Sequence, residues 1–141
     1  MVSIIDSTKE GKVNTTIKLA LLWVSVMCCY VYGDFFSLFV PGRLQNMIDT
    51  DAILDNPLKL FAAAVLMTIP SLMIPFSVIL KRSISQWLNI IFGIIFTGIM
   101  LLITFTSSGA WWSFYIYLAI VESILTACIV WMAWKWPVNQ L

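Results

Sequence analysis

The chain contains no histidine, and only 11% of its 141 residues are charged. The absence of histidine removes the commonest metal ligand and the commonest general base of enzymes. The shortage of charge excludes an ordinary soluble domain, because such domains carry about 25% charged residues. A formal net charge of +1 offers no basic face for nucleic acid, so no nucleic-acid partner is expected.

Cysteine is also scarce, with Cys28, Cys29 and Cys128 and no C-x-x-C motif. Neighbouring residues of a helix point about 100° apart, so Cys28 and Cys29 are poorly placed for a mutual disulfide. Buried thiols most often act as small hydrophobic groups. From these absences we expect no metal site, no cofactor and no catalytic residue.

Hydrophobic residues, by contrast, make up 61% of the chain, and the mean hydropathy is +0.96. Lipid must then be the solvent for most of the surface. A helix needs roughly 20 mostly apolar residues to cross the hydrocarbon core. Four such stretches are present, at residues 17–40, 58–80, 87–106 and 111–134. The sequence predicts an all-α fold, a single-domain transmembrane four-helix bundle that spans a cell membrane several times, either a bacterial inner membrane or a plasma membrane.

The segments outside the spans are short. Residues 1–15 form a polar N-terminal tail, and residues 41–57 form the longest loop. Two interpretations of this loop are open: an ordinary loop, or a short amphipathic helix in the membrane interface. The apolar residues of that helix are Leu44, Met47, Ile48, Ile53 and Leu54.

Basic residues gather at one end of the predicted bundle. These six are Lys9, Lys12, Lys18, Lys81, Arg82 and Lys135. Only Arg43 and Lys59 fall at the other end. The positive-inside bias therefore predicts that both termini are cytoplasmic and that loop 41–57 faces outward.

Two carboxylic acids lie inside the spans, Asp34 in the first and Glu122 in the fourth. Acids at membrane depth are costly and usually face the bundle interior or a water-filled cavity. At a rise of about 1.5 Å per residue, Tyr30, Thr68 and Thr97 fall in nearly the same layer as Glu122. The predicted ligand- or proton-binding site therefore comprises Asp34, Glu122, Tyr30, Thr68 and Thr97.

Spacings of three and four residues put both acids on a single face of their helices. The face in the first span consists of Trp23, Met27, Tyr30, Asp34 and Ser37. The face in the fourth span consists of Tyr115, Ala119, Glu122, Thr126 and Ile129. If these faces pack together, the Tyr30 hydroxyl lies near the Glu122 carboxyl group.

No lysine or arginine lies deep within a span to neutralise either acid. Burial disfavours a charged carboxylate, so at least one acid should hold a proton or a bound cation at neutral pH. The functional hypothesis is an outward-opening pocket that takes up protons or a cationic or hydroxyl-bearing ligand. The structural alternative is that protonated acids and hydroxyls link the helices, at roughly 0.6–2 kcal/mol per hydrogen bond.

Prolines and glycines in the second and third spans affect how the helices pack around the layer that contains the acids. Pro70 and Pro75 each remove a backbone donor, which predicts a kink that neighbouring hydroxyls accommodate. In the third span, Gly93 and Gly98 flank Thr97 and permit close helix contact. We interpret these glycines as packing residues.

The stretch from Leu19 to Gly42, LALLWVSVMCCYVYGDFFSLFVPG, resembles the opening of a family of small uncharacterised bacterial four-span membrane proteins. The fourth-span acid followed by WMAWKWP, Trp131 to Pro137, is similar to the ending of that family. The family groups loosely with the DoxX-like proteins. The resemblance implies a four-helix bundle with both termini inside, and it implies no established activity.

Three function classes remain. The first is a carrier or receptor for a small ligand, linked to protons through Asp34 and Glu122. The second is a non-catalytic membrane subunit that docks another protein or a copy of itself as a homo-oligomer. A membrane enzyme is ranked last, because only carboxylate acid–base chemistry is available to it.

Overall fold

The computed structural model describes residues 14–48, 56–107 and 109–136. Its elements are α1 (Thr15–Ser37), α2 (Arg43–Ile48), α3 (Pro57–Ile79), α4 (Arg82–Thr106), the 3₁₀ turn η1 (Ala110–Trp112) and α5 (Ser113–Trp134). The described segments contain no strand. Helices α1, α3 and α4, and the segment formed by η1 and α5, are long and apolar enough to cross a membrane. The predicted all-α, four-helix membrane architecture is confirmed.

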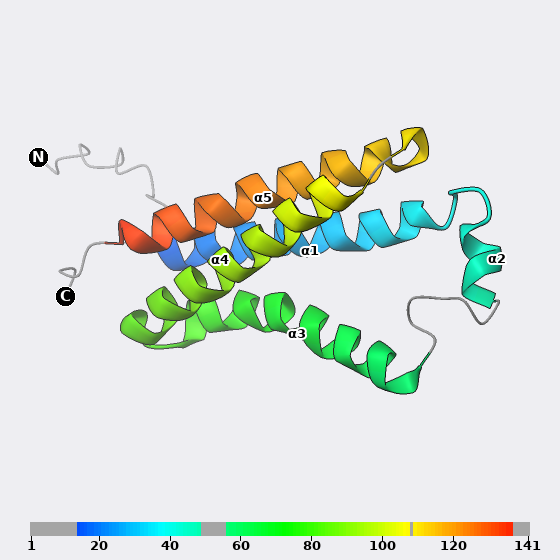
Figure 1. Cartoon of the computed structure of the whole chain (residues 1–141). Coiled ribbons are helices and arrows are strands. Elements are labelled where there is room, and N and C mark those ends of the chain that lie inside the picture. Colours follow the sequence, from blue (N-terminus) through cyan, green and yellow to red (C-terminus); the bar gives the residue numbers. More distant parts are fainter. Residues whose placement is uncertain (1–13, 49–55, 108, 137–141) are drawn as a thin grey trace, which may run out of the picture.

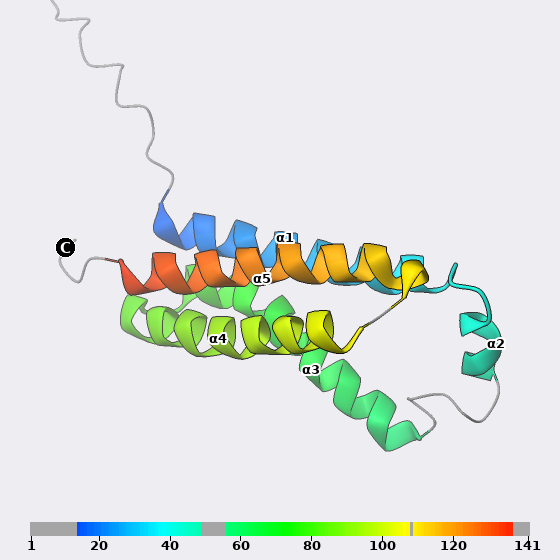
Figure 2. The same ribbon diagram turned by 45° about the horizontal axis from the view of Figure 1, so that its top comes forward.

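The four long helices run alternately up and down (Figure 1). Helix α5 lies between α1 and α4 and packs along both, while α3 packs mainly on α1 and only lightly on α4. We call the end of the bundle that carries α2 the α2 end, and the end that carries the α3–α4 connection the turn end. Helix α1 begins and helix α5 ends at the turn end (Figures 1 and 2).

Helix α1 ends at Ser37, earlier than the predicted boundary at residue 40. The next three residues form i→i−3 turns, in which the amides of Leu38, Phe39 and Val40 donate to the carbonyls of residues 35–37. Pro41 follows, and a proline disfavours the α conformation of the residue before it. The chain therefore leaves the helix just after Asp34, which brings that acid close to the end of α1.

Helix α3 is capped at its start and bent inside. The Asn56 side chain accepts a hydrogen bond from the Leu58 amide at 2.9 Å, and Pro57 occupies the first turn, where its missing N–H costs nothing. Pro70 and Pro75 lie within the continuous helix, and its first half turns away from α1 and α4 (Figures 1 and 2). Within this helix only Pro70, Met73 and Ser77 are buried.

Helix α4 begins at Arg82, several residues before the predicted start at residue 87. No proline or glycine occurs from residue 82 to residue 86, so nothing in the local sequence prevents the helix from extending. The added turn carries Ser85 and Gln86 into the bundle. The Gln86 amide donates to the Ala133 carbonyl of α5 at 2.9 Å.

A fully buried polar cluster joins three helices near the turn end. The Trp23 indole N–H of α1 donates to the Asn89 side-chain oxygen at 2.8 Å, and the Ser77 hydroxyl of α3 lies 3.2 Å from the same oxygen. The Asn89 amide nitrogen donates to the Ser85 carbonyl at 2.8 Å. Trp23, Ser77, Ser85 and Asn89 are each 0% exposed. Because hydrocarbon offers no substitute partner, this cluster fixes the register of α1, α3 and α4.

The loop predicted at residues 41–57 contains the short helix α2, as one of the two interpretations required. Its apolar side chains Leu44, Met47 and Ile48 are all exposed on the chain, which suits a position against lipid. Ile53 and Leu54, the other two residues of that interpretation, lie outside the described residues, as does most of the polar tail predicted at residues 1–15.

Candidate functional site

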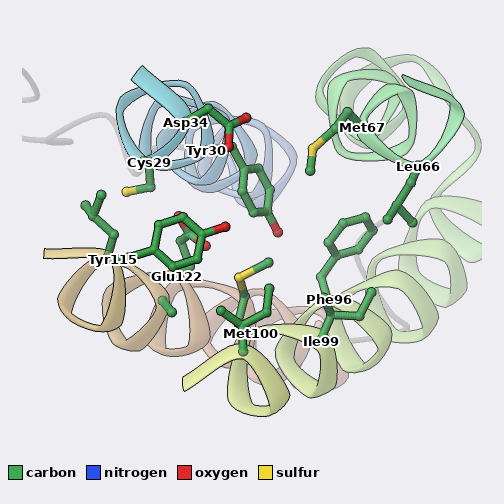
Figure 3. Close-up of a pocket in the computed structure, with 14 residues that line it drawn as sticks. Cys29, Tyr30, Asp34, Leu66, Met67, Phe96, Ile99, Met100, Tyr115 and Glu122 are labelled. Carbon is green, nitrogen blue, oxygen red and sulfur yellow. The ribbon is translucent and has the colours of Figure 1, made fainter. Parts of the chain in front are cut away.

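A cavity of about 120 Å³ lies between α1, α3, α4 and α5, toward the α2 end. Its polar lining comes from Tyr30 and Asp34 of α1 and from Tyr115 and Glu122 of α5. The rest of the wall is mostly hydrophobic, with Met67 of α3 among the lining residues. Figure 3 shows the carboxyl groups and tyrosines gathered on the side of α1 and α5, opposite the apolar side chains of α3 and α4.

The two predicted helix faces do pack together, and this contact creates the polar side of the cavity. On α1 the buried residues include Trp23, Tyr30 and Ser37, and on α5 they include Ala119 and Glu122. Their spacing therefore identified the buried side of each helix, with the exception of Asp34, which belongs to the predicted α1 face but is exposed. Gly33 lies at this contact, where an added Cβ would meet the side chains of Tyr115 and Leu118 at 3.6 Å, an ordinary van der Waals distance.

Glu122 is the most deeply buried acid of the described chain, at 4% exposed. It lies near the middle of α5, with the neighbouring turns occupied by Ala119 and Thr126. No lysine or arginine of the described segments forms a salt bridge with it, and the ionisable group that acts on it most is another acid, Asp34. A buried carboxyl group without a cation is most stable in its neutral form.

Tyr30 contributes a second polar group without a partner. Its side chain is 7% exposed, and its hydroxyl is buried without a hydrogen bond to any described residue. The ring packs at 6.2 Å, centroid to centroid, from that of Phe96, and the hydroxyl points into the cavity (Figure 3). The predicted proximity of Tyr30 and Glu122 holds in that both line one cavity, but they form no direct hydrogen bond.

Asp34 differs from Glu122 in being exposed. It sits in the last turn of α1, about 4.5 Å along the axis from the final helical residue. Asp34 and Tyr115 line both the cavity and a second, more polar hollow of about 400 Å³ at the α2 end. This second hollow, which we call the vestibule, is also lined by Ser37, Arg43, Ile103, Thr106, Ser107 and Trp112.

Arg43 supplies the positive charge of the vestibule. Its guanidinium lies 5.4 Å from the centroid of the Trp112 ring, a distance at which a cation is attracted to the ring face. Its Nε is buried and has no hydrogen-bond partner among the described residues. Asp34 is thus next to a cation and the vestibule, whereas Glu122 is separated from both.

The two threonines of the predicted site do not line the cavity. Thr68 is exposed on α3, and its hydroxyl donates to the Ala64 carbonyl of its own helix at 2.8 Å. Thr97 faces α5, where its hydroxyl donates to the Thr126 hydroxyl at 2.7 Å. Depth along the membrane normal, which grouped these residues, says nothing about which way a side chain points around its helix.

Three residues near the acids were not among the predicted site residues. Tyr115 was on the predicted inward face of α5, and that periodicity was the available signal. Cys29 lines the cavity through its position one residue before Tyr30. Arg43 gave no signal in the sequence, because its place beside Asp34 depends on how the chain folds back after Pro41.

The chemistry of this arrangement lies in its acidic and aromatic side chains. Among the described residues, no group of three or more histidine, cysteine, aspartate or glutamate side chains is arranged to hold a metal ion. The cavity instead combines two carboxyl groups with the aromatic rings of Tyr30, Phe96 and Tyr115. Carboxylates and aromatic faces together are what organic ammonium groups bind.

A family model described as "Family of unknown function (DUF6326)" matches residues 8–141. The chain belongs to this family. No curated protein and no solved structure matches it. Membership of DUF6326 agrees with the predicted resemblance to a family of uncharacterised proteins, while the link to DoxX-like proteins and a bacterial origin stay predictions.

For this DUF6326 chain, the four spanning helices and the composition together indicate a multi-pass membrane protein. The cavity between Asp34 and Glu122 is its strongest candidate site. It combines a deeply buried acid, an unpartnered hydroxyl and a polar connection to one end of the bundle.

Proposed function

We propose that this protein binds a small organic cation in the cavity, in exchange for a proton held by Glu122. The observation that carries the proposal is the buried Glu122 carboxyl group, which has no cationic partner and faces the same cavity as the unpartnered Tyr30 hydroxyl. An ammonium group would supply the positive charge that Glu122 lacks. Because an ammonium group accepts no hydrogen bond, Tyr30 would contact it through the hydroxyl oxygen.

The size and lining of the cavity limit the head group of the ligand. A cavity of about 150 Å³ in an apolar protein core holds one benzene molecule, and this cavity measures about 120 Å³. It therefore suits a group of about half a dozen non-hydrogen atoms, such as a methylated ammonium. The rings of Tyr30, Phe96 and Tyr115 offer the aromatic surface that such groups prefer.

The exchange balances in charge. Before binding, Glu122 carries a proton and is neutral; when the cation arrives, the carboxyl group gives up that proton and becomes the carboxylate that pairs with it. Asp34 and Tyr115 line both the cavity and the vestibule, so polar groups are available along the route by which the proton leaves. One positive charge enters and one leaves.

Isothermal titration with tetramethylammonium, on the protein in lipid nanodiscs, tests this proposal. Because this probe carries its charge at every pH, any pH dependence reports the protein. We expect the affinity to rise with pH by up to about tenfold per pH unit while Glu122 still holds its proton. Glu122→Gln should abolish that dependence and weaken binding at high pH, whereas Thr68→Val, a change outside the cavity, should alter neither.

Neutral tert-butanol, which is similar in size to tetramethylammonium, serves as the control ligand. It should bind no better at high pH than at low pH. If Glu122→Gln binds tetramethylammonium with the affinity and pH dependence of the parent protein, the exchange does not occur.

A second candidate function is that of a membrane subunit that docks a second copy of the chain. The observation in its favour is an apolar groove of about 520 Å³ between the outer faces of α4 and α5, bordered by Gly98, Val130 and Trp134. A helix approaches closely where a glycine leaves space. Native mass spectrometry after mild detergent extraction should then reveal a dimer that Gly98→Leu disrupts, and a monomer at all concentrations argues against it.

We also propose that both termini are cytoplasmic. Lys81, Arg82 and Lys135 lie at the turn end, where α1 begins and α5 ends, and cytoplasmic segments are enriched in such residues. A membrane-impermeant thiol reagent applied to intact cells should label Ser107→Cys at the α2 end and leave Ser83→Cys unlabelled. The reverse pattern would invert the topology.

A further inference from the structure

The side of the cavity formed by α3 and α4 is built differently from the side that carries the acids. Before Pro70, helix α3 contributes no buried residue, and this half diverges from α4 and α1 in both views (Figures 1 and 2). Helices α3 and α4 are consecutive in the chain, yet they pack on each other only lightly. Helices α3 and α4 are thus only lightly packed on each other at the level of the cavity, and the proposed opening lies between them.

Hydrophobic side chains border this opening. Leu66 of α3, which is 37% exposed, and Ile99 and Ile103 of α4, which are half-buried, all line the cavity. In Figure 3 Leu66 and Ile99 lie across the cavity from Tyr115 and Glu122. In a membrane, this border faces lipid chains. A molecule lying in the cavity therefore has a carboxyl group at one end and hydrocarbon at the other.

The other way into the cavity passes a positive charge. The vestibule is the polar route from the α2 end, and Arg43 is held over the Trp112 ring within it. A cation arriving from water meets this fixed guanidinium before it reaches Glu122, although Asp34 offsets part of the repulsion. The side chains of α3 and α4 that line the cavity include no charged residue.

We propose that the natural ligand is an amphiphilic amine that enters from the bilayer between α3 and α4. Its ammonium head lies against Glu122 and Tyr30, and its hydrocarbon tail passes Leu66 and Ile99 and extends into the lipid. The cavity has room for the head alone, so the tail must leave through the opening. This inference rests on the proposed function, because it names the class of cation that the same site binds.

Two probes separate the routes: tetramethylammonium, which has a head alone, and decyltrimethylammonium, which has the same head and one tail. Both are radiolabelled and bound to the protein in nanodiscs, and their release is followed by rapid filtration. Leu66→Trp fills the opening, and Val65→Trp, at the neighbouring exposed position that does not line the cavity, is the matched control. Leu66→Ala widens the opening.

We expect Leu66→Trp to slow the release of decyltrimethylammonium by about tenfold, because extra bulk in a narrow passage must be displaced. Tetramethylammonium, which leaves through the vestibule, should be released at the parental rate. Val65→Trp should change neither rate, and Leu66→Ala should speed the release of the tailed probe. The alanine variant keeps the test decisive if the tryptophan variant fails to fold.

The inference is overturned if Leu66→Trp and Leu66→Ala leave the release of decyltrimethylammonium unchanged, or if each changes both probes equally. In that case binding of tetramethylammonium that depends on Glu122 would still leave the proposed function standing. If neither probe binds, both fail. Nanodiscs with and without phosphatidylethanolamine distinguish the sources of the amine: competition identifies a bilayer lipid, and its absence identifies a free amphiphile.

Discussion

Replacing Asn89 by leucine should destabilise the bundle more than any other single change to a polar side chain near the turn end. Asn89 is 0% exposed and is the acceptor of the Trp23 indole N–H at 2.8 Å. It also donates to the Ser85 carbonyl at 2.8 Å. A leucine can do neither, so the indole N–H of α1 is left buried in an apolar environment without a partner.

The expected cost follows from these contacts. An orphaned buried donor costs about 1–3 kcal/mol. Each interhelical hydrogen bond lost within a membrane protein adds on the order of 0.6 kcal/mol, and the Ser77 hydroxyl loses its contact as well. Asn89→Leu should therefore lower the free energy of unfolding by about 2–4 kcal/mol.

Steric trapping in bicelles measures this free energy without relying on tryptophan fluorescence. Gln86→Leu, one turn earlier in α4, is the matched control: it removes an amide that is only part-buried and makes one bond, to Ala133. We expect it to cost less than about 1 kcal/mol.

A double-mutant cycle isolates the hydrogen bond itself. Trp23→Phe removes the indole N–H, so combining it with Asn89→Leu leaves no orphaned donor on the indole. The double variant should be more stable than the sum of the two single changes predicts, by about 1 kcal/mol or more. Additive costs, or a cost for Asn89→Leu no larger than that for Gln86→Leu, would mean that the hydrogen bond between Trp23 and Asn89 does not stabilise the bundle.

Two further predictions compare matched positions. A Cβ at Gly93 would lie 2.6 Å from the Val130 side chain, whereas nothing lies within 4 Å of a Cβ at Gly98. Gly93→Ala should therefore destabilise the bundle in the same assay by roughly 1 kcal/mol, despite the better helix propensity of alanine. Gly98→Ala should be neutral or slightly stabilising. Equal effects of the two alanines would contradict the close approach of α4 and α5. Thr97→Val breaks the hydrogen bond to Thr126 and should lower the stability by roughly 0.6–2 kcal/mol without changing the affinity for tetramethylammonium. Thr68→Val should change the stability by less than about 0.5 kcal/mol, because Thr68 is exposed and bonds only within α3. A loss of affinity in Thr97→Val would return that residue to the site.

The inward faces of α1 and α5 could be predicted because the spacing of residues within a helix is fixed by its geometry. Trp23, Tyr30 and Glu122 are buried as the three-and-four spacing indicated. The four spans followed from composition, since a run of apolar residues long enough to cross a bilayer needs no knowledge of tertiary contacts. These features depend only on local sequence.

What could not be predicted depends on the rotation and tilt of one helix against another. Thr68 is exposed on α3 and bonds only within its own helix, so the depth that it was predicted to share with Glu122 did not identify a residue of the cavity. The hydroxyls of Ser71 and Ser77 bond the carbonyls of Met67 and Met73, not the carbonyls of residues 66 and 71 that the two prolines release. The predicted accommodation of the kink by neighbouring hydroxyls was therefore wrong in its details.

Asn89 is a residue that sequence reasoning overlooked although a signal was present. It is an amide within an apolar span, and such a group is costly unless its donors and acceptors are paired. Its position alone therefore required partners on neighbouring helices. The identity of those partners, Trp23 and Ser77, required the packing of α1, α3 and α4.

The polar cluster around Asn89 also determines where a bound molecule can go. Phe96 lines the cavity and packs edge-on against Trp23, with ring centroids 6.1 Å apart, and Trp23 is itself tied to Asn89. These three side chains, each no more than 1% exposed, close the bottom of the cavity toward the turn end. A bound molecule would therefore leave by the vestibule or by the proposed opening between α3 and α4, and not toward the turn end.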